Sequence, residues 1–168
     1  MKSLHDLTSL RYRNVLIIDD EPAIHQMFST CLQPDSDQEE TSLSTAGEQM
    51  VDIKKRIYNF IVHSALSGEE ALELCKTQRK YNAPIQMAFV DMRMKGWNGV
   101  ETIKQLLDFD HRMNFVIMTG FPDDTRDKVE EHLGAAPLQI FAKPTNLEQI
   151  YDAAYSLTSR WNRLHGDN

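Results

Sequence analysis

The sequence is poor in the features that mark several large classes of protein. Its 168 residues include two cysteines, Cys31 and Cys75, and each lies among apolar positions with helical spacing. We interpret them as small buried hydrophobic residues in a reducing compartment, and not as a disulfide or a metal pair. The six histidines are scattered, without the spacing of metal ligands. A histidine or cysteine metal site is therefore not expected.

The chain also lacks long apolar runs and clusters of positive charge. No apolar stretch approaches the roughly 18 residues that span a bilayer, and the N-terminus has no apolar core of a signal peptide. The net charge is −7, which argues against nucleic acid as a direct partner because phosphate neutralisation supplies most of such affinity. We expect a cytoplasmic protein, or the cytoplasmic part of a longer one, that neither inserts into a membrane nor binds nucleic acid directly.

The apolar residues that are present alternate between the strand and the helix pattern. Continuous apolar runs predict five strands, at 14–18, 58–65, 85–90, 114–118 and 138–142. Apolar spacing of three and four predicts helices that follow these strands, from Pro22 to the residues before Pro34 and at 68–80, 99–108, 124–133 and 146–164. Such alternation is typical of an α/β fold with a doubly wound parallel sheet.

Three helix starts share one capping pattern. Ser67, Asn98 and Thr145 each stand three residues before a glutamate, which is the spacing of a capping box or a close relative of it. We therefore expect these three side chains to cap their helices.

The connection between the first helix and the second strand is longer than usual. Residues 33–57 begin with an acidic, polar stretch and continue with a weakly amphipathic helical pattern, so we interpret them as a helical insertion. The expected organisation is a lead-in over 1–12, one domain over 13–158, and a helix extension over 159–168.

The last helix has apolar residues at the spacing of a heptad seam. These residues are Leu147, Ile150, Ala154, Leu157, Trp161 and Leu164. Two interpretations stay open. The domain itself covers the end of this helix, or the helix starts a coiled coil that leads to an absent output domain or pairs two chains in a homodimer.

Polar side chains with useful chemistry stand at the ends of the predicted strands. Asp19 and Asp20 follow the first strand, Asp91 the third, Thr119 the fourth and Lys143 the fifth. In a parallel sheet these ends meet at one edge. Crowded carboxylates need a cation to stay ionised, and hard oxygen ligands suit Mg²⁺.

A phosphoryl group fits this set of residues. The lysine and the threonine hydroxyl would supply a positive charge and a hydrogen-bond donor for phosphoryl oxygens, and the carboxylate of Asp91 can act as the nucleophile. Taken alone, Asp91 could also be an ordinary strand-end carboxylate that caps the next loop.

Four motifs together resemble the receiver domain of response regulators in two-component phosphorelays. They are IIDDEP at the first strand, FVDMRMKGWNG at the third, IMTG at the fourth and FAKP at the fifth. The resemblance implies a flavodoxin-like sheet of order 2-1-3-4-5. It also implies that Asp91 accepts a phosphoryl group from the phosphohistidine of a histidine kinase or histidine phosphotransfer protein. Thr119 would swing inward to bond that group, Lys143 would contact it, and only slow autodephosphorylation would follow.

The same resemblance assigns the Mg²⁺ ligands and the residues that tune the switch. Asp20, Asp91 and the backbone carbonyl of Arg93 would bind the ion directly, and Asp19 more through water. Arg93 and Phe121 would overhang the phosphoryl group and slow the attack of water on it. Ile140 stands where the family usually has a switch aromatic, so either the neighbouring Phe141 replaces it or the coupling runs through the fourth helix alone.

Other functions remain as alternatives. The insertion and the long last helix resemble receivers at the N-terminus of hybrid histidine kinases and of cyclic-dinucleotide enzymes, so the chain could be a fragment of such a protein. A receiver-like binding scaffold without phosphorylation is a second alternative. A haloacid-type phosphatase is disfavoured because it needs a second aspartate where this chain has Arg93.

Overall fold

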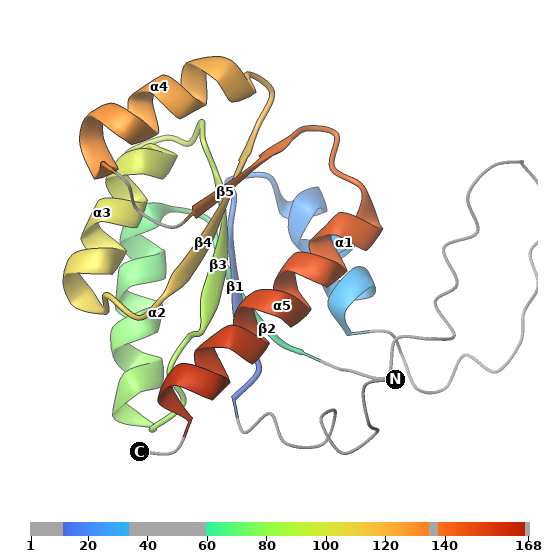
Figure 1. Ribbon diagram of the computed structural model, residues 1–168. Coiled ribbons are helices and arrows are strands. Elements are labelled where there is room, and N and C mark those ends of the chain that lie inside the picture. The colour runs from blue at the N-terminus through green and yellow to red at the C-terminus, as the bar shows by residue number, and fades with distance from the viewer. Residues whose placement is uncertain (1–11, 34–59, 135–137, 167–168) are drawn as a thin grey trace, which may run out of the picture.

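Five apolar strands lie side by side in one parallel sheet of order β2-β1-β3-β4-β5 (Figure 1). The computed structural model describes residues 12–33, 60–134 and 138–166. The strands are β1 (Asn14–Ile18), β2 (Ile61–Ala65), β3 (Met87–Asp91), β4 (Asn114–Thr119) and β5 (Leu138–Ala142). Every residue of the three central strands is buried. Continuous apolar runs suit these strands because helices cover both faces of the sheet.

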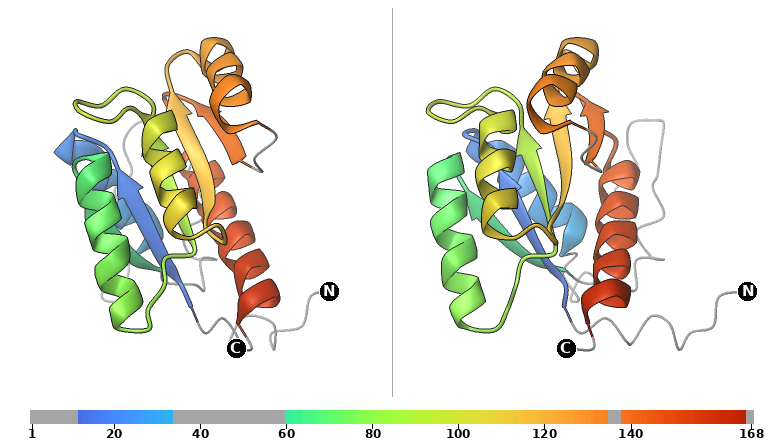
Figure 2. Two further views of the ribbon diagram at one scale, coloured as in Figure 1. Left: turned by 90° about the vertical axis from the view of Figure 1, so that its left-hand side faces the viewer. Right: turned by 60° about the vertical axis from the view of Figure 1, so that its left-hand side comes forward.

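The helices form a layer on each face of the sheet, as Figures 1 and 2 show. On one face lie α1 (Pro22–Leu32) and α5 (Leu147–His165). On the other lie α2 (Gly68–Lys80), α3 (Gly99–Phe109) and α4 (Pro122–Leu133). Alternate residues of each strand therefore point into two separate cores. Val15 and Ile17, for example, pack on the α1 and α5 side, and Leu16 and Ile18 on the other.

The predicted fold class and strand order are confirmed, while some boundaries differ. β2 begins at Ile61, and the predicted start at 58 lies outside the described residues. α4 begins at Pro122, two residues before the predicted start. Proline suits the first helical turn because its missing N–H would have no partner there. The predicted insertion at 33–57 lies almost wholly outside the described residues. The domain boundaries at 13 and 158 stay predictions.

Two of the three predicted caps are confirmed. The side chains of Ser67 and Asn98 accept hydrogen bonds from the backbone N–H three residues on. The cap at Thr145 was wrong, because α5 begins one residue later and Asn146 Oδ1 accepts from Glu148 N at 2.7 Å. The Thr145 hydroxyl instead donates to the carbonyl of Ala142.

The end of α5 packs on the rest of the fold. Trp161 is 2% exposed, and Tyr12 meets its ring edge-on with the ring centroids 5.5 Å apart. Asn162 binds the backbone of Tyr12 through both atoms of its amide group, at 3.0 and 2.7 Å. The seam is covered from Ile150 to Trp161, which favours the first of the two interpretations of this helix. A homodimer through α5 and a linker to an output domain stay predictions.

Both cysteines are buried, as expected. Burial raises the pKa of the Cys75 thiol to about 12, so it stays protonated and unreactive. In the part of the chain that the structure describes, each helix is too short or too polar to cross a bilayer.

Candidate functional site

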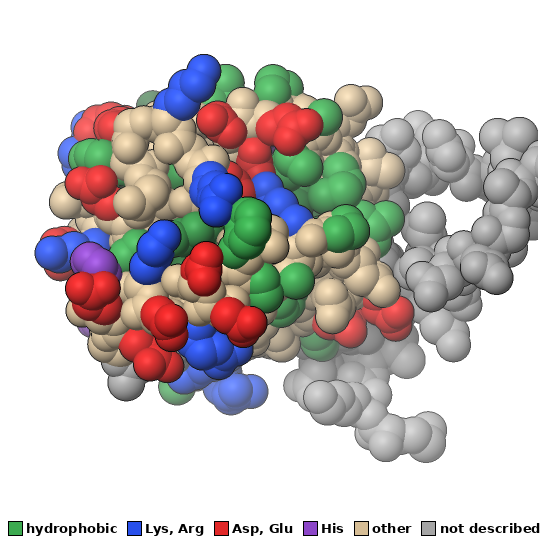
Figure 3. Space-filling view, turned by 90° about the horizontal axis from the view of Figure 1, so that it is seen from above, with side chains coloured by type: hydrophobic (Ala, Val, Ile, Leu, Met, Phe, Trp, Pro, Cys, Tyr) green, Lys and Arg blue, Asp and Glu red, His purple; other side chains and the backbone are tan. Residues whose placement is uncertain are grey.

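Three carboxylates meet at the carboxyl edge of the sheet. Asp19 and Asp20 directly follow β1, and Asp91 is the last residue of β3. Oxygens from all three lie within 4.8 Å of one another. Asp19 and Asp91 are nearly buried, and Asp20 is exposed. Figure 3 looks down on this edge and shows acidic and basic side chains side by side near its centre.

Lys143 joins the two buried carboxylates. It directly follows β5, and its Nζ lies 2.6 Å from Oδ1 of Asp91 and 3.1 Å from Oδ2 of Asp19. The peptide bond between Lys143 and Pro144 is cis. With Asp20 included, three carboxylates and one ammonium group carry a formal charge of −2, which is the charge that one divalent cation neutralises.

Backbone N–H groups hold the other carboxylate oxygens. Glu21 N donates to Oδ1 of Asp19 at 2.9 Å, and Arg93 N donates to Oδ2 of Asp91 at 3.0 Å. His25 Nε2 lies 2.7 Å from the backbone oxygen of Asp19, a distance at which its ring N–H donates to this carbonyl. The loops after β1 and β3 therefore orient the two carboxylates.

Burial and charge shift the pKa values of this cluster. Burial raises the pKa of the Asp91 carboxyl, the ammonium group of Lys143 opposes this shift, and the charge of Asp19 adds to it. Burial alone would lower the pKa of Lys143, but hydrogen bonds and charges from Asp91 and Asp19 outweigh it and raise this pKa. Lys143 is therefore charged at neutral pH, and a positive charge beside Asp91 favours its ionised form.

The donor set fits a hard divalent cation. Three carboxylates supply only oxygen atoms, and the exposed side chain of Asp20 leaves the group open to solvent. Mg²⁺ prefers such a set of a few carboxylates with several waters. Asp19, Asp20 and Asp91 are the residues that would hold it. The predicted contribution of the Arg93 carbonyl stays a prediction.

Thr119 is bound to the first turn of α4. It is 2% exposed, and its Oγ1 accepts from Phe121 N at 3.1 Å and from Thr125 Oγ1 at 3.0 Å. The carbonyl of Thr119 accepts from Lys143 N at 2.7 Å. This residue therefore connects the carboxylate cluster with α4.

Arg93 and Phe121 contact each other above the strand ends. The guanidinium carbon of Arg93 lies 4.2 Å from the centroid of the Phe121 ring, within the range of a cation–π interaction. Phe121 is 51% exposed. Beside this pair, the N-terminal half of α3 and one face of α4 line a hollow of about 720 Å³. Met92, Thr119 and Thr125 contribute to its walls.

Ile140 and Phe141 lie on opposite faces of the sheet. Ile140 packs in the core on the α3 and α4 side, whereas Phe141 packs in the core on the α1 and α5 side. Thr119 bonds Thr125 of α4, so Phe141 lies across the sheet from this contact. The role of Phe141 as a replacement switch aromatic stays a prediction, and this geometry favours coupling through α4.

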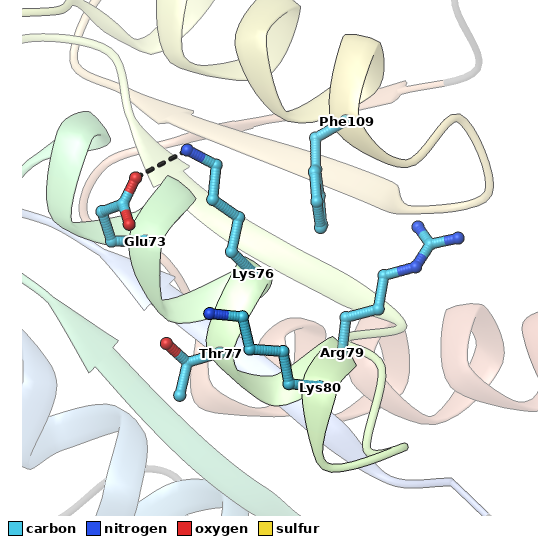
Figure 4. Close-up of a pocket in the computed structure, with 6 residues that line it drawn as sticks. All are labelled: Glu73, Lys76, Thr77, Arg79, Lys80 and Phe109. Atoms are coloured by element: carbon cyan, nitrogen blue, oxygen red, sulfur yellow. Dashed lines mark hydrogen bonds and ion pairs between the residues drawn. The ribbon is translucent and has the colours of Figure 1, made fainter.

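A second hollow lies away from the carboxylates (Figure 4). Its lining consists of Glu73, Lys76, Thr77, Arg79, Lys80 and Phe109, from α2 and the end of α3. Two of its three basic residues form ion pairs, Lys76 with Glu73 and Arg79 with Asp110. None of the predicted site residues lines this hollow.

Sequence reasoning missed two residues at the site. His25 was counted among scattered histidines, and Thr125 was not singled out. Thr125 stands four residues after Phe121 at the start of a helix, a spacing at which a threonine hydroxyl can bond the carbonyl one turn back. That spacing was the available signal, but the contact with Thr119 depends on how α4 sits against β4.

Comparison with known proteins places this geometry in a family. The family model of the response regulator receiver domain matches residues 53–155, which is more than half of the chain. Sporulation initiation phosphotransferase F from Bacillus subtilis is 28% identical over 89 residues. The aligned part makes up 53% of this chain and 66% of that protein, slightly less than two thirds of its length.

Solved structures agree with this fold. The chemotaxis protein CheY4 of Vibrio cholerae has a TM-score of 0.60 and 19% identity, over 87% of this chain and 98% of that one. A structure titled adenylate cyclase from Rhodopirellula baltica has a TM-score of 0.65 and 19% identity, over 92% and 93%. The matched sequence, the parallel sheet of order β2-β1-β3-β4-β5 and the carboxylates at its edge lead to one conclusion: this chain belongs to the response regulator receiver domains of two-component systems.

Proposed function

We propose that this chain is a Mg²⁺-dependent phosphoacceptor whose nucleophile is Asp91. The donor would be the phosphohistidine of a histidine kinase or of a histidine phosphotransfer protein. The observation that carries the proposal is the contact of Lys143 Nζ with both Asp19 and Asp91, beside three carboxylates that lie within 4.8 Å. A structural ion pair needs one carboxylate, whereas this cluster carries an excess of two negative charges.

The chemistry follows from the positions of these groups. A carboxylate oxygen of Asp91 attacks the phosphorus atom, the P–N bond of the phosphohistidine breaks, and the leaving imidazole keeps the electron pair and takes up a proton. A Mg²⁺ ion held by Asp19, Asp20 and Asp91 would neutralise charge on the transferred oxygens. Lys143 is close enough to Asp91 to bind the new phosphoryl group as well.

Thr119 would report the new charge to the surface. Its hydroxyl would turn from α4 toward the phosphoryl group and bond an oxygen, which would change the start of α4. A population shift of this kind needs a difference in contacts between the two states. The bonds of Thr119 to Phe121 and Thr125 are contacts that this rotation of the hydroxyl would break.

The experiment measures binding of beryllofluoride and phosphorylation by acetyl phosphate, each with and without Mg²⁺. We expect the wild-type chain to bind beryllofluoride only with Mg²⁺ present and to form an acid-stable, hydroxylamine-sensitive acyl phosphate with acetyl phosphate. Asp91→Asn should abolish both. Asp108→Asn, an exposed carboxylate on α3, is the matched control and should change neither.

A receiver-like scaffold that binds partners without phosphorylation is the second candidate. It predicts no response to either compound and the same partner binding by wild type and Asp91→Asn. We expect no enzymatic turnover by the phosphoacceptor beyond slow autodephosphorylation, and none by the scaffold. Membership in a hybrid kinase or a cyclic-dinucleotide enzyme stays a prediction that the complete reading frame would test.

A further inference from the structure

We propose that Thr125 is a positioning residue that holds the Thr119 hydroxyl against α4 and thereby sets how readily the site accepts a phosphoryl group. This inference rests on the proposed function and adds a regulating residue to the same site. Its basis is a hydrogen bond of 3.0 Å between the two hydroxyl oxygens, whose residues are each 2% exposed.

The Thr119 hydroxyl is held from two sides. A hydroxyl oxygen has two acceptor positions and one proton to donate. Phe121 N and Thr125 Oγ1 donate to Thr119 Oγ1, so both acceptor positions are used. A rotation of the Thr119 side chain toward Asp91 would carry its oxygen away from both donors. The phosphoryl group must therefore compete with these two bonds.

Thr125 can release Thr119 without being left unsatisfied. Its hydroxyl also lies 2.8 Å from the carbonyl oxygen of Phe121, one helical turn back. Its single proton can turn to that acceptor when Thr119 moves, so no buried donor loses its partner. Phe121 itself is half exposed. The restraint is therefore reversible and amounts to about one buried hydrogen bond, or roughly twofold to tenfold in an equilibrium constant.

This contact also links Thr119 to an element that is weakly attached. Among the described residues of α4, only Thr125 and Val129 are buried, and its N-terminus has no side-chain cap. The bond between Thr125 and Thr119 is therefore a main attachment of the first turn of α4 to the sheet. The hollow of about 720 Å³ next to it leaves room for that turn to move.

The test compares Thr125→Val with Thr125→Ser in the full chain. Valine keeps the shape of threonine but has no hydroxyl, and serine keeps the hydroxyl. The matched control is Thr102→Val on α3, because Thr102 is fully buried and its hydroxyl has no hydrogen-bond partner among the described residues. The readouts are the beryllofluoride concentration at half-saturation with saturating Mg²⁺, and the Mg²⁺ affinity without beryllofluoride, both from tryptophan fluorescence.

We expect Thr125→Val to reach half-saturation at a beryllofluoride concentration about twofold to tenfold lower than wild type, with unchanged Mg²⁺ affinity. Thr125→Ser and Thr102→Val should match wild type. If the half-saturating beryllofluoride concentration of Thr125→Val is equal to or higher than that of wild type, the role of Thr125 is overturned. An equal decrease of this concentration in Thr102→Val would overturn it as well.

If Thr125→Val does not fold, the serine variant decides. A Thr125→Ser chain that binds beryllofluoride more tightly than wild type overturns the proposal, and one that matches wild type supports it. A wild-type chain that does not bind beryllofluoride would instead overturn the proposed function, and this role with it.

Discussion

Lys143 has two opposing effects on the carboxylate cluster. Its ammonium group neutralises part of the charge of Asp19 and Asp91 and so stabilises the cluster. The same charge would repel an incoming cation and attract an incoming phosphoryl group. We therefore expect Lys143 to influence metal binding and phosphoryl binding in opposite directions.

Lys143→Met should separate these two effects. We expect Mg²⁺ to bind about tenfold more tightly, because a unit charge near the ion is removed. The beryllofluoride response should be lost, because its fluorine atoms, which take the places of phosphoryl oxygens, would lose their cationic partner. Fluorescence titration measures both quantities. Lys80→Met, on the distant hollow of Figure 4, is the control for the loss of a charge. Weaker Mg²⁺ binding by Lys143→Met would contradict the prediction that the charge of Lys143 opposes Mg²⁺ binding.

The Arg93 and Phe121 pair bears on the lifetime of the phosphoryl group. The guanidinium carbon of Arg93 lies 4.2 Å from the centroid of the Phe121 ring, and at this place the two side chains together would restrict the approach of water to a phosphoryl group on Asp91. We expect Arg93→Ala and Phe121→Ala each to raise the dephosphorylation rate about twofold to fivefold, the equivalent of one exposed cation–π contact.

The double variant tests whether these two side chains act as a pair. Its rate should be lower than the product of the two single effects. Loss of radiolabelled phosphate from the chain measures each rate. The control is Arg79→Ala, which removes a similar contact with Phe109 far from the site. Single variants that decay at the wild-type rate would rule out a shielding role.

The start of α5 shows how neighbouring polar residues compete for one role. Thr145 has the capping-box spacing, yet Asn146 is the cap. Asparagine is at least as good an N-cap as threonine, and the hydroxyl of Thr145 already donates to Ala142. A motif four residues long cannot reveal that competition, because the competition depends on where the chain leaves β5.

We expect Asn146→Ala to lower the free energy of unfolding by about 1 kcal/mol, the usual cost of a lost N-cap. Thr145→Ala should cost less than about 0.5 kcal/mol, as for most surface positions. Urea unfolding followed by circular dichroism measures both values. A larger loss of unfolding free energy in Thr145→Ala than in Asn146→Ala would show that Thr145 is the cap.

At the edge of the sheet opposite the site, Asp110 joins several elements. Arg112 donates to both of its carboxylate oxygens at 2.8 and 2.7 Å, and Arg79 of α2 adds a bond at 3.2 Å. Arg112 also lies 5.6 Å from the centroid of the Trp161 ring of α5. This network connects helices from both faces of the sheet, so its loss should weaken the whole fold.

The pH dependence of stability follows from this network. Burial would raise the pKa of Asp110, but its bonds with Arg112 and the nearby charges outweigh burial and hold the pKa below its ordinary value. Stability from this group is therefore fully present above the unfolded pKa of about 3.9, and is lost as pH falls through the lower folded pKa.

Asp110→Asn should be less stable than wild type at pH 7 by roughly 1–3 kcal/mol. This difference should shrink as the pH falls below about 4, because Asp110 then takes up a proton in wild type as well. Urea unfolding at pH 7 and at pH 3 tests this, with Asp108→Asn as the exposed control. If wild type and Asp110→Asn differ in free energy of unfolding by the same amount at pH 7 and pH 3, the titration of Asp110 does not cause the pH dependence of stability.

The fold and the location of the site could be predicted because their signals are local. The apolar run Asn14–Ile18 is a strand buried on both faces, and the three central strands are each buried along their whole length. Parallel strands bring their carboxyl ends to one edge, so Asp19, Asp91 and Lys143 were predicted to lie at the same edge of the sheet. Periodicity and chain direction alone carry this inference.

Contacts between distant segments were decided by the tertiary structure. The family match begins at residue 53, after the strand that carries Asp19 and Asp20, so it is the sheet that places this acidic pair beside Asp91. The burial of Trp161 and the bond between Thr125 and Thr119 likewise depend on how α5 and α4 pack. The pattern of residues along the chain determines which face of its own helix or strand a side chain lies on. Which residue that side chain contacts depends on where another helix or strand lies, and only the packing of the elements determines this.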